Sequence, residues 1–274
     1  MKPPLCPISG SPMNLLFTEK VLGKYDASYF FSPDSGLITT PEPTWLAEAY
    51  QSAITATDVG LVTRNINNRT NVSWVLPFLG LEQGPYLDLG GGYGLFARLM
   101  RDEGFNFFTT DPFCENMFAK GHEPDPGFKA QALTAFEVFE HIADPLTFVK
   151  DAFSRYQTRT LIFSTLTYGD APPGLDWWYW CFETGQHITF YNRRSLALIA
   201  EKLGCHYFSL SDELHVITDQ PLNRIQKIVL RNRRARKFYD KMTRKRRRTR
   251  ESLIWPDYEA ARTRLRAHQN SLVP

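Results

Sequence analysis

The chain has 274 residues, of which 43% are hydrophobic, 14% aromatic and 22% charged. A chain of this length and composition can bury a full core, which excludes a disordered or low-complexity protein. It contains no apolar run near the ~20 residues that span a bilayer and no signal-peptide segment at its N-terminus, so we expect a soluble, cytoplasmic protein. The four cysteines lie far apart, which is typical of reduced thiols rather than of a disulfide framework.

The net charge of +3 is unevenly distributed along the chain. Residues 224–250 contain 14 lysines and arginines against one acid, Asp240, which gives this segment a net charge of +13. Residues 251–274 are balanced, so residues 1–223 carry a net charge of −10. An acidic body is therefore followed by a strongly basic C-terminal segment.

Residues 1–40 have the pattern of a small β unit. Cys6-Pro7-Ile8-Ser9-Gly10 and Ser32-Pro33-Asp34-Ser35-Gly36 share one layout and are separated by two strand-like runs, Leu15–Val21 and Ala27–Phe31. The unit resembles a zinc ribbon in which serine replaces three of the four cysteine ligands. Because a serine hydroxyl is not ionised near neutral pH and binds zinc poorly, we expect no metal here.

The next 60 residues lead from two helices into a glycine-rich turn. Apolar residues at helical spacing predict a helix over Thr44–Asn65 and a second one over Val72–Leu79. In the stretch Tyr86–Phe96, an apolar run leads into a cluster of glycines and then into residues of helical composition. The sequence therefore predicts a strand, a tight turn and a helix in this order.

The glycine turn suits a nucleotide-like ligand. Gly90, Gly92 and Gly94 lack a Cβ, so backbone amides can approach an anionic group at the helix N-terminus. Asp88 precedes the first glycine, and Leu95 occupies the sixth place of the G-x-G-x-x-G fingerprint, which weakens a dinucleotide interpretation. The pattern D-x-G-x-G-x-G after a strand resembles the first motif of class I S-adenosylmethionine (SAM)-dependent methyltransferases. In that family the loop passes along the methionine part of the cofactor, S-adenosyl-L-methionine.

An acid ends the second strand-like run, Phe105–Thr110, about 20 residues beyond the glycines. Asp111 at this place can accept hydrogen bonds from both ribose hydroxyls of a nucleotide. Phe113 offers an aromatic face to adenine, with packing in the core as the alternative. Only sixteen residues separate Asp111 from Phe128, too few for a full helix and a third strand. The adenine contact that the resemblance implies is therefore unassigned, with Gly121-His122-Glu123 as the candidate segment.

The segment Ala132–Pro145 carries a more specific resemblance. A buried strand runs out into Phe-Glu-Val-Phe-Glu-His and then Asp-Pro, which resembles the "EVLEH…DP" segment of the same methyltransferases. The resemblance implies that Phe136 contacts the cofactor and that Glu137 lies near the acceptor, and it makes His141 a further catalytic candidate. It also implies a lid of helices before the glycine turn, with Arg64 near the methionine carboxylate. A solvated arginine at a helix end is the alternative.

A fifth buried strand is predicted over Thr160–Leu166. The irregular stretch that follows, Thr167–Thr184, contains four consecutive aromatics and lies where ligands of open α/β sheets bind, so it is a candidate acceptor-binding wall. Simple packing of its tryptophans onto the domain is the alternative. Gly185–Tyr191 resembles the "G-Q-H-I-x-x-Y" segment of methyltransferases that act on sugars and other small acceptors. Within it, His187 is the candidate general base, because an imidazole titrates near pH 7.

The last part of the chain predicts a closing hairpin and a basic arm. Tyr207–Leu210 and Leu214–Thr218 have the pattern of antiparallel strands. Beyond Pro221, spaced apolar residues predict a long basic helix, and Ser252–Leu265 predicts a short final one. The run Arg244–Arg248 suits RNA, anionic lipid or the acidic body of the protein. We favour a solvated or self-docking helix over nucleic acid or a membrane surface.

Together these patterns predict three parts: a degenerate zinc-ribbon-like β unit (1–40), a SAM-dependent methyltransferase domain (41–220) and a basic helical extension (221–274). The expected fold is α/β and doubly wound, a mostly parallel seven-stranded Rossmann-like methyltransferase sheet. The expected activity is methyl transfer from SAM to a small-molecule acceptor such as a sugar or saccharide intermediate. RNA methylation through the basic arm and a non-catalytic module that binds an anionic partner are the alternatives.

Overall fold

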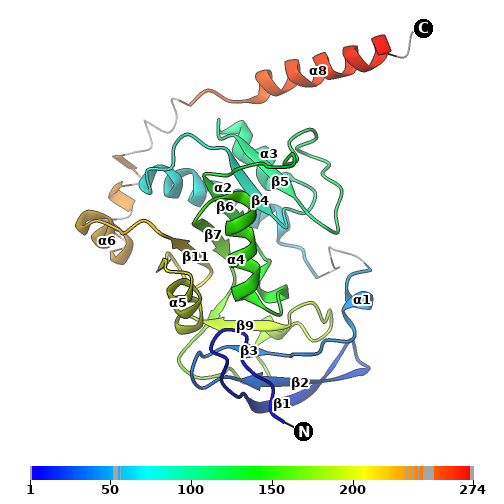
Figure 1. The fold of residues 1–274 in the computed structure, drawn as a ribbon, viewed down its shortest axis with the longest axis vertical. Coiled ribbons are helices and arrows are strands. Elements are labelled where there is room, and N and C mark those ends of the chain that lie inside the picture. Colours follow the sequence, from blue (N-terminus) through cyan, green and yellow to red (C-terminus); the bar gives the residue numbers. More distant parts are fainter. Residues whose placement is uncertain are drawn as a thin grey trace. The chain divides into compact units, whose positions relative to one another are not determined.

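The structure is a computed structural model that describes residues 2–51, 55, 57–232, 234, 235, 237–239, 241, 242 and 250–271. The chain divides into two compact units, whose elements are labelled in Figure 1. The first unit consists of Met1–Val59 and Ala132–Asn223, and the second consists of Gly60–Gln131 and Arg224–Pro274. Each unit therefore joins two segments that are distant in the sequence, and the expected domain of residues 41–220 is divided between them.

The first unit contains a five-stranded sheet in the order β1-β2-β3-β9-β8. Its strands are β1 (Asn14–Val21), β2 (Tyr25–Phe31), β3 (Ile38–Thr39), β8 (Thr167–Tyr168) and β9 (Thr189–Asn192). The first three strands form an antiparallel meander, as expected for two of them, and β3 then pairs with β9. The N-terminal β unit is therefore not separate, because the open edge of β3 takes a partner from a strand 150 residues further along the chain.

A cluster of buried aromatic side chains packs on this sheet. Tyr29, Trp180 and Phe190 are at most 1% exposed, and the ring of Trp180 lies 4.4 Å from Phe190 and 5.6 Å from Tyr29. Tyr179 is also buried, whereas Trp178 is 72% exposed. The expected acceptor-binding wall is thus largely a packing surface, since burial of large aromatic rings against the N-terminal hairpin removes much apolar area from water.

Two turns near the N-terminus hold Cys6, Ser9, Ser32 and Ser35, the four positions that match zinc-ribbon ligands. The Sγ atom of Cys6 lies 3.2 Å from Oγ of Ser35 and accepts the N–H of Ser9 at 3.5 Å, while Ser32 Oγ accepts the N–H of Ser35 at 3.3 Å. Burial disfavours the Cys6 thiolate, but hydrogen bonds from these serines outweigh it and lower the pKa of the thiol. Hydrogen bonds therefore link the two turns.

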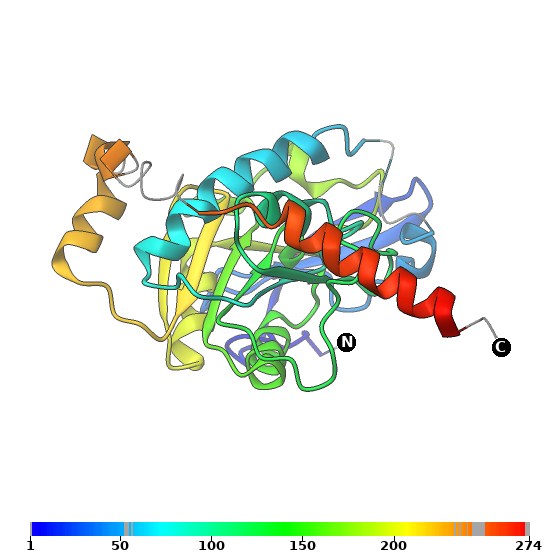
Figure 2. The ribbon, with the colours of Figure 1, turned by 90° about the horizontal axis from the view of Figure 1, so that it is seen from above.

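A second sheet of the first unit has the strand order β10-β11-β7-β6. Its strands are β6 (Ala132–Ala135), β7 (Thr160–Ser164), β10 (His206–Ser209) and β11 (Leu214–Thr218). β6 and β7 are parallel, and β11 and β10 add the expected antiparallel hairpin; Figure 2 shows the green and yellow strands of this sheet side by side. The helices α4 (Pro145–Tyr156) and α5 (Arg193–Lys202) precede β7 and β10.

The start of α4 follows from its sequence. Pro145 occupies the first turn, and the carboxylate of Asp144 accepts the backbone N–H of Thr147 at 3.0 Å. A proline and an aspartate are the residues preferred at these places of a helix N-terminus. Before α4 the chain makes a short 3-10 turn, η1 (Phe139–His141), in which Phe139 and Glu140 are fully buried.

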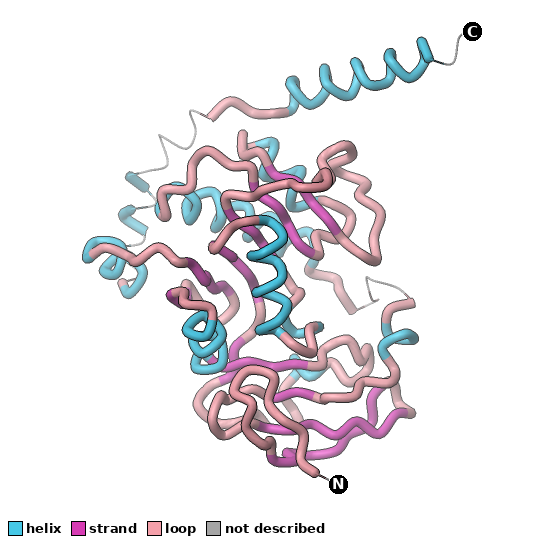
Figure 3. The backbone as a smooth tube through the Cα atoms, in the orientation of Figure 1, coloured by secondary structure: helices cyan, strands magenta, loops and turns pink. Residues whose placement is uncertain are grey.

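In the second unit, β4 (Tyr86–Leu89) and β5 (Phe107–Thr110) pair in parallel, with Asp88 opposite Thr109. The helix α3 (Leu95–Asp102) follows the glycine turn as predicted. The segment between β5 and residue 131 contains neither helix nor strand and is drawn as loop in Figure 3, in agreement with its short length. Parallel strands in both units confirm the mixed α/β class, while the count of seven strands stays a prediction.

The helices before β4 differ from the expected pair. The chain has a short α1 (Leu46–Ala49) in the first unit and one long helix, α2 (Leu61–Phe78), in the second. The predicted helix over Thr44–Asn65 is therefore wrong in its middle part, where turns occur at residues 57–60. Residues 63–71, which form the first half of α2, are mostly polar. This half of the helix therefore has no apolar stripe from which it could be predicted.

The C-terminal arm belongs to the second unit and is not one long helix. The helix α6 (Arg224–Arg231) has eight residues, and α8 (Ile254–Ser271) is the predicted final helix, extended to 18 residues. The expected apolar stripe is largely exposed, with Ile225, Ile228 and Phe238 at 71%, 60% and 66%. The basic run of residues 244–248 lies outside the described residues. Within the described ranges, no helix is long and apolar enough to cross a membrane.

Candidate active site

The glycine turn joins β4 to α3 and has the backbone conformation that the sequence implied. Gly90, Gly92 and Gly94 have φ values of 63°, 55° and 82°, a region that residues with a Cβ rarely adopt. Gly94 is the N-cap of α3, so the turn leads directly into the helix N-terminus. The three predicted glycines are therefore required by the backbone itself.

Gly91 is a functional position that sequence analysis missed. Its φ is not positive, but a Cβ on Gly91 would overlap the hydroxyl of Thr109 and the carboxylate of Asp88. Asp88 is 2% exposed and lies at the end of β4, directly beneath the turn. The run of three consecutive glycines was the available signal, because alternating glycines would have sufficed for a positive-φ turn alone.

Asp111 connects the end of β5 to the glycine turn. Its Oδ2 atom accepts the N–H of Gly92 at 2.9 Å, and its Oδ1 atom accepts the N–H groups of Phe113 and Cys114 at 2.7 and 2.9 Å. Two carboxylate oxygens offer about four lone-pair sites, so the three amides leave capacity for a further donor. The acid predicted to bind ribose is thus held rigidly beside the turn.

A cavity of about 350 Å³ opens next to this carboxylate. Its volume lies within the range of about 300–1,000 Å³ that is usual for small-molecule sites. It is lined by Gly92, Thr109, Thr110, Asp111, Cys114, Glu115, Asn116, Lys120 and Glu123. The Oγ1 atom of Thr109 is buried beside Gly91 and makes no hydrogen bond to any described residue.

The remaining cofactor candidates of the second unit lie outside the lining of this cavity. Arg64 is in the first turn of α2 and the Phe113 ring is 64% exposed. Of the candidate adenine segment, Glu123 lines the cavity, whereas His122 is buried and lies 3.5 Å from Asp257. The structure therefore brings Gly92, Asp111 and Glu123 together and leaves the roles of Arg64 and Phe113 as predictions.

In the first unit, the chain leaves β6 through a strained residue. Glu137 has a φ of 54° although it is not a glycine, a conformation that often marks functional sites. Its backbone N–H donates to Ser164 Oγ at 2.8 Å, and the same hydroxyl donates to Glu137 Oε1 at 2.7 Å. Ser164 ends β7, so these two bonds fix Glu137 at the carboxyl ends of two parallel strands. Phe136 beside it is half-buried.

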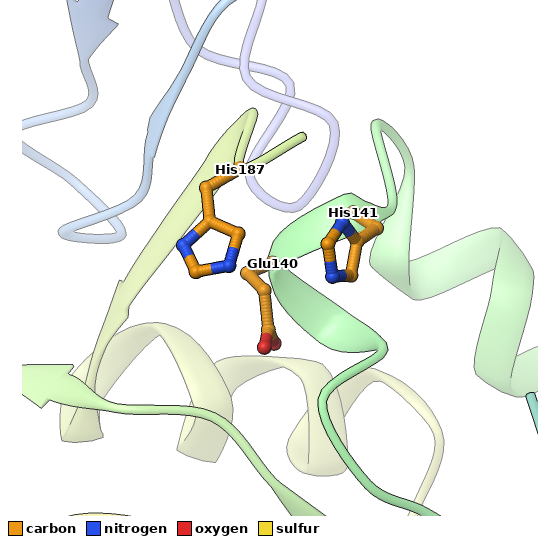
Figure 4. Close-up of side chains that lie close together, drawn as sticks. All are labelled: Glu140, His141 and His187. Atoms are coloured by element: carbon orange, nitrogen blue, oxygen red, sulfur yellow. The ribbon is translucent and has the colours of Figure 1, made fainter. Parts of the chain in front are cut away.

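His187 and His141 lie close together, with their ring centroids 5.1 Å apart (Figure 4). The Nδ1 atom of His187 is 2.8 Å from the carbonyl oxygen of Tyr179, and Nδ1 of His141 is 2.9 Å from that of Gln186. A carbonyl oxygen only accepts, so each Nδ1 carries a proton, and in the neutral form of either ring Nε2 carries the lone pair. Burial lowers the pKa of His141, which favours the neutral ring.

Glu140 is the residue of this region that sequence analysis missed. It is fully buried, and its carboxylate lies close to the two histidines (Figure 4). Its charge also contributes, after burial, to the raised pKa values of Tyr179 and Tyr191. The Glu-His pair in the sequence was the available signal, but Glu137 was given the acidic role there.

Comparison with known proteins places this arrangement in a family. The family model described as "Methyltransferase domain" matches residues 64–210, more than half of the chain. The match covers β4 to β10, with the glycine turn, Asp111 and the segment around His187. The chain therefore belongs to the methyltransferase domain family. It is a class I SAM-dependent methyltransferase, and its cofactor is S-adenosyl-L-methionine.

Several solved structures are similar in fold. Human N-acetylserotonin methyltransferase in complex with SAM is 13% identical, with a TM-score of 0.41 over 65% of this chain and 66% of that one. Magnesium protoporphyrin IX methyltransferase from Synechocystis PCC 6803 is 13% identical, with a TM-score of 0.40 over 64% and 91%. An O-methyltransferase family protein from Burkholderia thailandensis is 14% identical, with a TM-score of 0.45 over 66% and 68%. No curated protein matches the sequence.

Proposed function

We propose that this protein transfers the methyl group of SAM to a small-molecule acceptor, such as a sugar or saccharide intermediate. The observation that carries the proposal is the cavity beside Asp111, at the carboxyl ends of β4 and β5, in a chain of the methyltransferase family. Ligands of open α/β sheets bind at this end of the strands. A small acceptor follows from the resemblance of the Gly185–Tyr191 segment to methyltransferases of that kind.

The second unit supplies the groups that would hold the cofactor. Asp111 has one lone pair left for a ribose hydroxyl. The glycines of the turn lack a Cβ, so the methionine part can come close to the backbone there. Asn116 and Glu123 add polar side chains to the cavity wall. Because Gly91 has no Cβ, the turn can pack directly on the carboxylate of Asp88 at the end of β4.

The chemistry needs an aligned acceptor and a base. The sulfonium of SAM makes its methyl carbon electrophilic, an acceptor oxygen attacks that carbon, and the carbon–sulfur bond breaks to leave S-adenosylhomocysteine. The acceptor proton goes to a general base, and we assign this role to Nε2 of His187, because its Nδ1–H is held by the Tyr179 carbonyl. Glu137 and His141 are assigned to the positioning of the acceptor, since they are fixed at the exit of β6.

Cofactor binding tests the first part of the proposal. We expect Asp111→Asn to weaken the binding of S-adenosylhomocysteine roughly 10- to 100-fold, because a hydrogen bond from a ribose hydroxyl to the charged carboxylate is worth about 1.5–3 kcal/mol. Isothermal titration calorimetry measures the change. Asp125→Asn is the matched control, since Asp125 is exposed in the same loop and outside the cavity lining. Equal affinity of wild type and Asp111→Asn would contradict the proposal.

Binding of RNA decides between the small acceptor and the main alternative. A protein that neutralises several phosphates loses affinity steeply as salt concentration rises. Tight RNA binding with such a salt dependence, together with methylation of the RNA, would replace the small acceptor by a nucleic acid.

A further inference from the structure

Three side chains of the first unit form a compact group of nitrogen and oxygen donors. Glu140 and His141 come from η1, and His187 precedes β9. One donor atom of each lies within 4.8 Å of the other two, and Figure 4 shows the carboxylate and both rings turned toward a common space. The ligand atoms of a tetrahedral ion lie about 2.1 Å from the metal and therefore roughly 3.4 Å from one another. Side-chain rotations that move each donor atom by about 1 Å would bring the three atoms around one ion.

Both histidines have the tautomer that a metal site requires. Each Nδ1–H donates to a backbone carbonyl, that of Gln186 for His141 and that of Tyr179 for His187. Metal-bound histidines almost always donate their second ring N–H in this way, which fixes the ring and raises the basicity of the ligand nitrogen. The Nε2 atoms of both rings are consequently the donors.

Backbone contacts hold η1 and β9 in one arrangement. The N–H of Ile188 donates to the Glu140 carbonyl at 2.8 Å, the hydroxyl of Thr189 donates to Ile142 O at 2.8 Å, and that of Tyr191 donates to Phe139 O at 2.8 Å. Three hydrogen bonds along four consecutive residues leave little freedom between the two segments. The donor group is therefore prearranged by the fold rather than by a ligand.

The charge of the group suits a cation. Glu140 is fully buried, and a buried carboxylate is stabilised by a positive charge beside it. Two neutral imidazoles and one carboxylate carry a single negative charge in total.

We propose that Glu140, His141 and His187 bind one divalent first-row transition-metal ion, of which Zn²⁺ is the representative. Imidazole nitrogen selects such ions over Mg²⁺ and Ca²⁺, which prefer oxygen ligands only. Three protein ligands leave at least one coordination position open, as in catalytic rather than structural metal sites. From the sequence, no metal ligand was assigned to any part of the chain, on the ground of the serines in the N-terminal turns, and this group lies elsewhere in the same unit.

The proposal rests on the proposed function in one respect only, the use of the open position. An acceptor hydroxyl bound there would lose its proton more easily, because a metal ion lowers the pKa of a bound oxygen. His187 would then act as a ligand instead of the base, and the proton of the metal-bound hydroxyl would pass to bulk water. Ion binding itself does not depend on SAM or on methyl transfer.

A titration with Co²⁺ tests the site, since Co²⁺ replaces Zn²⁺ and absorbs visible light according to its coordination. The full chain is treated with a chelator, dialysed and titrated, with Zn²⁺ as competitor. We expect one ion per chain, displaced by Zn²⁺. Glu140→Gln and His187→Gln should each lower the affinity at least 100-fold, because loss of even an outer partner of a ligand costs about 10- to 100-fold.

Two control variants make the test specific. Asp151→Asn removes an exposed carboxylate of α4, and His206→Gln removes an exposed histidine, both in the same unit. Both should keep the wild-type affinity. Thermal melting identifies any variant that fails to fold. If a ligand variant does not fold, the test depends on the wild type alone, which must bind Co²⁺ saturably, one ion per chain, with the absorption spectrum of nitrogen and oxygen ligands.

The proposal is overturned if the wild type shows no saturable binding at millimolar Co²⁺, or if folded Glu140→Gln and His187→Gln bind as the wild type does. Calorimetry with S-adenosylhomocysteine on the metal-free protein separates this outcome from a failure of the proposed function. Metal binding without cofactor binding would contradict the methyltransferase proposal alone, and the reverse result would contradict the metal site alone.

Discussion

Gly91 shows how a single missing methyl group shapes the cofactor cavity. A Cβ there would overlap both the Asp88 carboxylate and the Thr109 hydroxyl, and both side chains are buried, which leaves them little space to move. We expect Gly91→Ala to destabilise the protein by about 1–3 kcal/mol, as overpacking usually does, and to weaken cofactor binding. Chemical denaturation and calorimetry measure the two effects.

Gly169→Ala is the control for this substitution. Gly169 has open space around the position of a Cβ and no positive φ, so alanine should leave stability within about 0.5 kcal/mol of the wild type. An equally small effect of Gly91→Ala on stability would contradict the prediction, because it would mean that the turn has space for a Cβ at position 91.

At the scale of residues, local spacing predicted the cofactor side better than the acceptor side. Asp111 could be found because its distance from the glycines follows from a strand, a turn and a helix of ordinary length. Glu140 could not, because its role depends on His187, and the hydrogen bond between Ile188 and Glu140 joins positions that no local pattern relates.

At the scale of elements, ion pairs to a single carboxylate, that of Asp257, connect α8 to α3. Asp257 Oδ1 lies 2.5 Å from Arg101 Nη2, and its Oδ2 accepts hydrogen bonds from Arg101 Nε and Arg98 Nη1, both at 2.8 Å. The side chains of Arg101 and Asp257 are only 6% and 12% exposed. We expect Asp257→Asn to cost about 3 kcal/mol, because it leaves a buried guanidinium uncompensated. Urea denaturation measures the loss.

The same ion pair predicts a dependence of stability on pH. Burial opposes the ionisation of Asp257, but hydrogen bonds from Arg101 and Arg98 outweigh it, so the pKa of the carboxyl is lowered. Its contribution is complete above about pH 4 and is lost as the pH falls through the folded-state pKa. The wild type and Asp257→Asn should therefore converge in stability at low pH. Glu259→Gln, at an exposed pair, should show no such convergence.

Elements with strong local signals were predicted correctly, and those that depend on packing were not. α3 follows from the glycine turn, and α4 follows from Asp144 and Pro145. The apolar residues of the basic arm look like a buried stripe in the sequence, yet Ile225 and Ile228 are largely exposed. The spacing of apolar residues predicts that a helix has an apolar and a polar face, but it does not predict which surface of the protein, if any, covers the apolar face.

At the scale of the whole molecule, both units are assembled from segments that the predicted domain boundaries would separate. A fragment of residues 41–220 would lack β1, β2 and the whole of β3, the strand that pairs with β9, and it would also lack Asp257. We expect this fragment to lose cooperative thermal unfolding, measured by circular dichroism. A fragment of residues 2–271 should melt as the full chain does. A cooperative transition of the shorter fragment would show that 41–220 is a domain after all.

This organisation explains why the fold class was predictable and the division of the chain was not. Strand and helix types follow from local patterns, but the pairing of β3 with β9 is chosen by edges and aromatic rings that meet only in the folded state. No sequence pattern around residues 38 and 190 indicates that these two segments pair, so the N-terminal strands were expected to form a unit of their own.

The pairing of β3 with β9 also has a consequence for synthesis on the ribosome. Thr39 and Thr189, whose hydroxyls meet in that pair, are 150 positions apart. At about 5–20 residues per second, the partner strand is made roughly 8–30 s after β3. During this interval the N-terminal hairpin has an open edge and uncovered aromatic rings, a state that favours aggregation. Nascent chains should therefore need a holding chaperone until β9 has left the ribosome.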